Sequence, residues 1–158
     1  MAASFSLTGS LRLDPRWTDD LNTTTVLDSA RVNITFALTN GDDDGEADAY
    51  WKDVRTVAAA TTDTLDLSAL PLSLFGGSEP LDMATVRLIY VRNLSATIEL
   101  TYEIAGGSDA GIPPGGSFMW FAPEATADVW LAGSQLIEIA NDGASAANYE
   151  IILIGVKA

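Results

Sequence analysis

The side chains that could do chemistry in this sequence are carboxylates, hydroxyls, amides and indoles, because the chain has no histidine and no cysteine. A Ser-His-Asp triad, a Cys-His pair and a thiolate or imidazole zinc site are therefore excluded. A Ser-Lys dyad would need Lys52 or Lys157, and neither lies in a recognisable nucleophile motif. Paired carboxylates for glycoside cleavage stay open, but 22 acidic residues single out no pair. We predict no enzyme and no cofactor.

The first candidate cluster is the segment Trp51-Lys52-Asp53-Val54-Arg55-Thr56. If this segment is a strand, Trp51, Asp53 and Arg55 lie on one face, because side chains alternate along a strand. The structural interpretation is an ion pair or hydrogen-bonded anchor beside a large aromatic ring, which fixes strand register. The functional alternative is a carbohydrate platform, with the indole stacked on a sugar. We favour the structural interpretation.

The other tryptophans pose the same choice between a ligand platform and a buried position. Trp120 and Trp130 are expected in the core or in an interface, because a large aromatic side chain stabilises most when it is buried. Trp17 lies in a polar segment and is a further interface candidate.

The one candidate ion site is Asn40-x-Asp42-x-Asp44-Gly45, which resembles the first half of a calcium-binding loop. The bidentate glutamate that such a loop needs six positions after the glycine is replaced by Trp51. We therefore interpret Asp42 and Asp44 as part of a solvated acidic loop and predict no metal, with a loosely held calcium as the alternative.

The formal net charge of −14 bears on the choice of partner. A surface of this sign repels phosphate backbones and anionic membranes, so we expect neither nucleic acid nor a membrane as partner. No segment has the ~20 apolar residues of a membrane span. The N-terminal residues also lack the pattern of a secretory signal.

Alternating apolar residues predict strands along most of the chain. We expect them at about 4–13, 31–39, 50–59, 62–67, 118–121, 127–131, 136–139 and 149–156, with Val32, Ile34, Phe36 and Leu38 pointing inward. About ten short strands and no segment with helical periodicity indicate an all-β protein. An antiparallel β-sandwich of the jelly-roll type fits best, because closed two-sheet folds leave few free edges.

The most strongly patterned segment, Val86 to Glu103, predicts a hairpin whose turn is formed by Asn93-Leu94-Ser95-Ala96. Its first half is apolar on both faces, as a central strand covered on both sides requires. Residues 50–67 predict a second hairpin. Residues 71–80 and 105–117, which are rich in proline and glycine, are expected to be loops.

We expect one domain. Residues 1–30 form an N-terminal strand and an extended arm, and residues 31–158 form the sandwich core. The arm includes Arg16 to Ser29, a polar segment without clear periodicity that could reach a neighbouring subunit.

Several short motifs, in their order along the chain, resemble a family of small all-β proteins from the structural-gene regions of tailed phages and prophages. The motifs are Ala47-Asp48-x-x-Trp51-x-Asp53-x-Arg55-Thr56, Thr64-Leu65-Asp66-Leu67, Val91-Arg92-Asn93-Leu94-Ser95, Ile112-Pro113-Pro114-Gly115-Gly116-Ser117-Phe118, Ile137-x-Ile139-x-Asn141 and Tyr149-x-Ile151-Ile152-Leu153-Ile154-Gly155. The resemblance covers about Ala47 to Val156. The first 46 residues have no counterpart in it.

The resemblance implies a virion component without catalytic activity, assembled in the host cytoplasm. We expect a capsid decoration (cement) protein that binds neighbouring major capsid subunits or other virion proteins, as a homo-oligomer. The alternatives are a carbohydrate- or receptor-binding fibre or spike domain, and a tail-tube or neck protein.

Overall fold

The computed structural model describes residues 6–13, 16–21, 24–29, 32–74, 77–104, 110–124 and 135–158. These residues form fifteen strands and one short 3-10 helix, so the protein is all-β, as the sequence predicts, with more strands than the expected ten. In chain order the elements are β1 (Leu7–Leu13), β2 (Arg16–Leu21), β3 (Thr24–Ser29), β4 (Val32–Asn40), β5 (Glu46–Ala47), β6 (Ala49–Val57), β7 (Thr61–Asp66), η1 (Leu67–Ala69), β8 (Leu70–Leu74), β9 (Gly77–Leu81), β10 (Met83–Asn93), β11 (Leu100–Ile104), β12 (Ala110–Ile112), β13 (Ser117–Phe121), β14 (Leu136–Asn141) and β15 (Ala147–Lys157).

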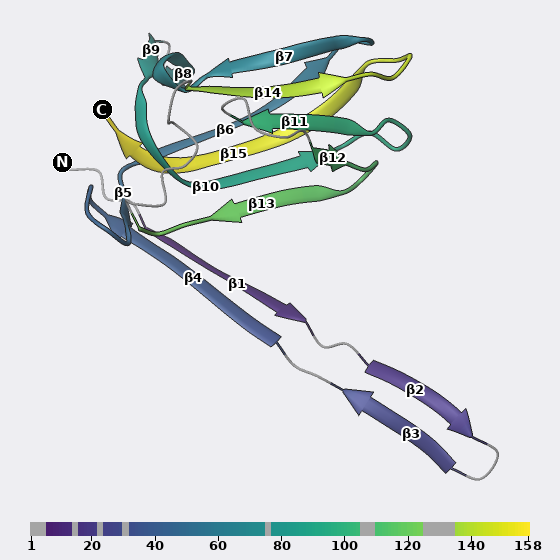
Figure 1. The fold of residues 1–158 in the computed structure, drawn as a ribbon. Coiled ribbons are helices and arrows are strands. Elements are labelled where there is room, and N and C mark those ends of the chain that lie inside the picture. Colours follow the sequence, from purple (N-terminus) through teal and green to yellow (C-terminus); the bar gives the residue numbers. More distant parts are fainter. Residues whose placement is uncertain are drawn as a thin grey trace.

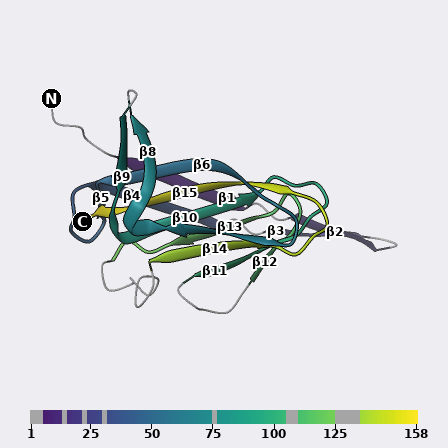
Figure 2. The same cartoon turned by 90° about the horizontal axis from the view of Figure 1, so that it is seen from above.

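Two four-stranded antiparallel sheets form the body of the protein. Sheet I has the strand order β13-β10-β15-β6, and sheet II has the order β12-β11-β14-β7. The two sheets lie one above the other in Figures 1 and 2. No helix among the described residues has the length and apolar character needed to cross a membrane.

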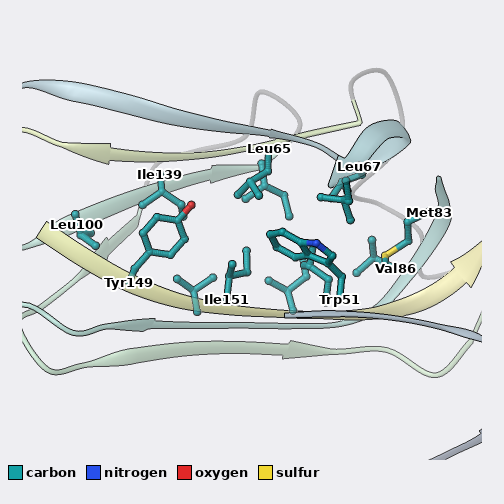
Figure 3. Packing of buried hydrophobic residues seen from close by; sticks show 14 of the residues in the cluster. Trp51, Leu65, Leu67, Met83, Val86, Leu100, Ile139, Tyr149 and Ile151 are labelled. Carbon is teal, nitrogen blue, oxygen red and sulfur yellow. The ribbon is translucent and has the colours of Figure 1, made fainter. Parts of the chain in front are cut away.

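The core lies between the two sheets. Trp51, Tyr149 and Ile151 of sheet I point toward Leu65 and Ile139 of sheet II, as Figure 3 shows. Side chains alternate along a strand, so Tyr149 and Ile151, two positions apart in β15, both point inward. Burial of this continuous apolar layer is the main force that holds the two sheets together.

The N-terminal strands form a two-stranded ribbon that stands away from the body (Figure 1). Its stem is β1 paired with β4, in the register Leu7↔Leu38 to Leu13↔Val32. Its tip is β2 paired with β3, for which only the backbone is described. The predicted boundary at residue 30 thus falls inside the ribbon, because strands from both sides of it pair with each other.

The base of the stem packs on the outer face of sheet I. Leu38 is buried there with Ala47, Leu88 and Ile154 in a second, smaller apolar cluster. Leu88 and Ile89, neighbours in β10, therefore face different clusters, and β10 lies between β13 and β15. The prediction of a central strand that is covered on both sides is confirmed for this segment.

The predicted hairpin from Val86 to Glu103 is wrong. Its two strands, β10 and β11, belong to different sheets. The connection between them crosses from sheet I to sheet II, and Asn93 holds it by donating to the carbonyls of Ile98 and Ile112 at 2.7 and 2.9 Å. The central strand β10 instead pairs with two more distant strands, which cover more apolar surface than one hairpin partner could.

The second predicted hairpin is wrong for the same reason, since β6 belongs to sheet I and β7 to sheet II. The turn between them has Ala60 at a positive φ of 53°. Alternation specifies which face of each strand is buried, but it does not say which strand is the partner. Leu65 and Leu67 are buried.

Two segments that were expected to be loops contain strands. Residues 71–80 include most of the hairpin β8–β9, and residues 105–117 include β12, which pairs with β11. Proline and glycine are tolerated in these strands because β12 is an edge strand and β8–β9 is a separate two-stranded sheet. The strand expected at 127–131 lies outside the described residues.

Candidate functional site

The cluster around Arg55 joins the two sheets at one edge of the body. Arg55 of β6 binds both carboxylate oxygens of Asp63 of β7, with Nε at 2.6 Å from Oδ2 and Nη2 at 2.9 Å from Oδ1. The hydroxyl of Tyr149, on β15, donates to the same carboxylate at 2.8 Å. Because Asp63 belongs to sheet II and its two partners to sheet I, these bonds connect the layers. The geometry is that of a structural anchor.

The electrostatics agree with this role. Hydrogen bonds from Arg55 lower the pKa of Asp63 below its usual value of 3.8 against the opposing effect of burial, and the bond from Tyr149 lowers it further. Burial, followed by the bond to Asp63, raises the pKa of Tyr149. The carboxylate and the phenol are thus each held in the protonation state that makes their bond.

Asp53 is the minor partner of Arg55. Its Oδ2 lies 3.3 Å from Nη1 of Arg55, and it also accepts a bond from the backbone N–H of Val54 at 2.8 Å. Sequence reasoning placed Asp53 and Arg55 on one face but missed Asp63. Asp63 lies in the alternating segment 62–67 on the same face as Leu65, and a charged residue on an apolar face is the signal that could have found it.

Trp51 is not a ligand platform. Its side chain is 3% exposed and lies in the core, and Nε1 donates to the carbonyl of Pro71 at 2.9 Å. Trp120 of β13 is half-buried and packs against the same core. Trp17 lies in β2, where the side chain is not described, and Trp130 lies outside the described residues.

Asn93 and Asn141 are buried amides that fix the loops at one end of the body. Asn93 accepts the N–H of Ser95 at 2.9 Å in addition to the bonds that its Nδ2 donates to the carbonyls of Ile98 and Ile112 and, at 3.3 Å, of Pro113. Asn141 donates to the carbonyls of Val57 and Ser145 at 3.1 and 2.9 Å, and it accepts the N–H of Gly143 at 2.9 Å. Each amide uses both its donor and acceptor groups, so both are structural.

The acidic loop after β4 differs in detail from the predicted ion site. The carboxylates that come within 4.8 Å of one another are those of Asp42, Asp43 and Glu46, while Asp44 is not in the group. Glu46 accepts the backbone N–H of Asp43 at 3.1 Å, so the loop is closed by its own hydrogen bond. Asp42 and Asp43 are exposed.

A shallow pocket lies on the outer face of sheet II. Its volume is about 210 Å³, and it is lined by Thr62, Thr101, Glu103, Glu138, Ala140 and Asp142. Glu103 and Glu138 stand directly opposite each other on β11 and β14. Two like charges at opposite positions destabilise a strand pair, so Glu103 and Glu138 do not stabilise sheet II. The lining can form hydrogen bonds with a small polar ligand.

Arg87 is an unusual residue of β10. It is 1% exposed, and its Nε and Nη1 atoms have no hydrogen-bond partner among the described residues. It lies where the pairing of β10 with β15 shifts register, between Val86 and Leu88. An arginine cannot lose its charge, so this burial lowers the stability of the fold.

Neither lysine is placed as a catalytic base. Lys52 forms an ion pair with Glu150 at 2.7 Å, and the hydrogen bond to Glu150 raises its pKa. Lys157 lies 3.3 Å from Asp48. Each amine thus lies beside a carboxylate.

No protein-family model matches the chain, and a search of curated proteins found no match.

Proposed function

We propose that the body is a jelly-roll sandwich. Numbered in chain order, its eight strands are β6, β7, β10, β11, β12, β13, β14 and β15. Sheet I then contains strands one, eight, three and six as neighbours, and sheet II contains strands two, seven, four and five. This is the strand order of an eight-stranded jelly roll, and it is the main support for the proposal. The ribbon then precedes the first strand, and β8–β9 is inserted between the second and the third.

On this basis we propose that the protein is a non-enzymatic structural component of a tailed-phage virion, most simply a capsid decoration protein. Jelly rolls occur in viral capsid proteins but also in lectins and enzymes, so the fold by itself does not choose a function. The motif resemblance to phage structural proteins supports the virion role. The absence of histidine and cysteine supports a role without catalysis.

The observation that carries the proposal is the tip of the ribbon. β2 and β3 pair only with each other among the described strands, and they lie well away from the body in Figure 1. An isolated two-stranded hairpin is only marginally stable in water. A tip of this kind gains stability when it packs on a partner, which is what a decoration protein needs to hold neighbouring capsid subunits.

The test is removal of the tip alone. Replacing residues 14–31 by Asn-Gly joins Leu13 directly to Val32, which are opposite each other in the stem, through a two-residue turn that favours hairpins. We expect this variant to keep the folded body and to lose co-sedimentation with undecorated capsids. Circular dichroism and the fluorescence of buried Trp51 check that the body is intact. Capsid binding equal to that of the full chain would refute the proposal.

The pocket on sheet II favours a second candidate, a carbohydrate- or receptor-binding domain. Its hydroxyl and carboxylate lining suits sugar hydroxyls, although the buried Trp51 removes the stacking platform first considered. This function predicts glycan-array binding that is lost in Glu138→Gln and kept in the tip-deleted variant. An array without signal would exclude it.

A further inference from the structure

The stem of the ribbon has one continuous apolar face. The register places Leu7 opposite Leu38, Gly9 opposite Phe36, and Leu11 opposite Ile34. Since alternate residues share a face, all three pairs lie on the same side of the stem. This side faces the body at the base, where the ring centroids of Phe36 and Phe121 are 5.2 Å apart and Leu38 is buried.

Beyond the base the same apolar face is uncovered. Leu11 is 41% exposed and Ile34 is 51% exposed, although Ile34 was expected to point inward. The reason is geometric, because the stem continues past the edge of the body (Figure 1). Two large aliphatic side chains directly opposite each other form a single exposed apolar patch.

The outer face of sheet I has a matching uncovered part. Next to the residues buried by the stem, Tyr90 stands between Met119 of β13 and Ile152 of β15 in register. Tyr90 and Ile152 are half-buried against the cluster that contains Leu38, while Met119, beyond them, is 44% exposed. Tyr50, opposite buried Ile154 on the edge strand β6, is 48% exposed. The apolar surface that receives the stem therefore extends beyond the stem.

We propose that the exposed part of the stem docks on this uncovered part of sheet I in a second copy of the chain. Both surfaces are continuous with the contact at the base of the stem, where apolar residues of the stem and of sheet I already pack together within one chain. Each of the two surfaces extends beyond the contact that it makes at the base of the stem. Each copy would therefore offer one free stem patch and one free sheet patch.

This contact is head-to-tail, because the stem of one copy meets the sheet of the next. Such an interface closes into a ring when its rotation permits, and otherwise it continues as a chain. The formal net charge of −14 per copy opposes association, so screening by salt should favour it. The inference concerns the isolated protein and does not depend on the proposed virion role.

The test uses two variants, Ile34→Glu on the stem and Met119→Glu on the sheet, studied by light scattering after gel filtration. The wild-type protein should form oligomers, and each variant alone should be a monomer. An equal mixture should form dimers and nothing larger, because one variant keeps an intact sheet patch and the other an intact stem patch. Thr35→Glu, on the opposite face of the stem, is the matched control and should leave the wild-type oligomer unchanged.

Leu11→Lys serves as a second stem variant if Ile34→Glu does not fold. Monomeric wild-type protein at high concentration and high salt would overturn the proposal. Monomers in the mixture of the two variants would also overturn it. The capsid-binding assay of the tip-deleted variant is separate, because that variant keeps Leu11, Ile34 and the whole of sheet I. Failure of the capsid role and failure of the self-association are therefore distinguishable.

Discussion

Asp63 is the residue on which the connection between the two sheets depends most. It accepts three hydrogen bonds from Arg55 and Tyr149 in a half-buried position. We expect Asp63→Asn to lower the free energy of unfolding by about 1–3 kcal/mol, because both partners lose their charged acceptor. Urea denaturation followed by tryptophan fluorescence measures this. Asp53→Asn is the control and should change stability by less than about 0.5 kcal/mol, since its ion pair is more exposed. Equal effects of the two changes would contradict the assignment.

The same group predicts how stability depends on pH. The pKa of Asp63 is lowered in the folded state, so its contribution is complete above the unfolded value of 3.8 and is lost as pH falls below it. The pKa of Tyr149 is raised, so its contribution is complete below 10.0 and decreases as pH rises further. Thermal unfolding of wild type and Asp63→Asn at several pH values should show the two proteins becoming more alike below pH 3.8. A difference that grows in acid would contradict this.

Replacement of Arg87 should have the opposite effect on stability from replacement of Asp63. Because its guanidinium is buried without a partner for Nε and Nη1, replacement by an apolar side chain of similar length removes a cost. We expect Arg87→Met to unfold at the same or a higher urea concentration than wild type. A marked loss of stability would show that the guanidinium has a stabilising role.

At the scale of elements, the buried amides determine how strands are connected. Asn93 satisfies the carbonyls of Ile98 and Ile112 and so guides the chain from sheet I to sheet II. We expect Asn93→Ala to cost roughly 2–6 kcal/mol, at about 1–3 kcal/mol for each of the two carbonyls left without a donor. Asn148→Ala, at an exposed position, should cost less than about 0.5 kcal/mol. Urea denaturation of both variants provides the comparison, and similar costs would exclude a special role for Asn93.

The limits of sequence reasoning also lie at this scale. Alternation predicted that Leu38 points inward, and Leu38 is buried, but it made the same prediction for the exposed Ile34. It could not identify strand partners, because the apolar face of β10 fits any strand of suitable pattern, and so two crossovers were predicted as hairpins. Asp63 was missed because the 22 acidic residues look alike until the fold places one of them beside Arg55.

At the scale of the whole molecule, the protein consists of a two-sheet body and a projecting ribbon. The projection of the ribbon explains the exposure of Ile34. The alternating pattern of residues 31–39 predicts that Ile34 is buried, but the side chain is exposed because the stem extends past the body (Figure 1). Isolated chains leave this apolar surface in water, and assembly would remove it. We expect partners to bind through the ribbon and through the outer face of sheet I.

The most direct measurement for the proposed virion role is a cryo-electron microscopy map of phage particles induced from cells that carry the gene for this chain. We predict density for the two-sheet body on the outside of the capsid, with the tip between neighbouring capsid subunits. A particle with no such density on its capsid, or with the body in the tail instead, would contradict the decoration role.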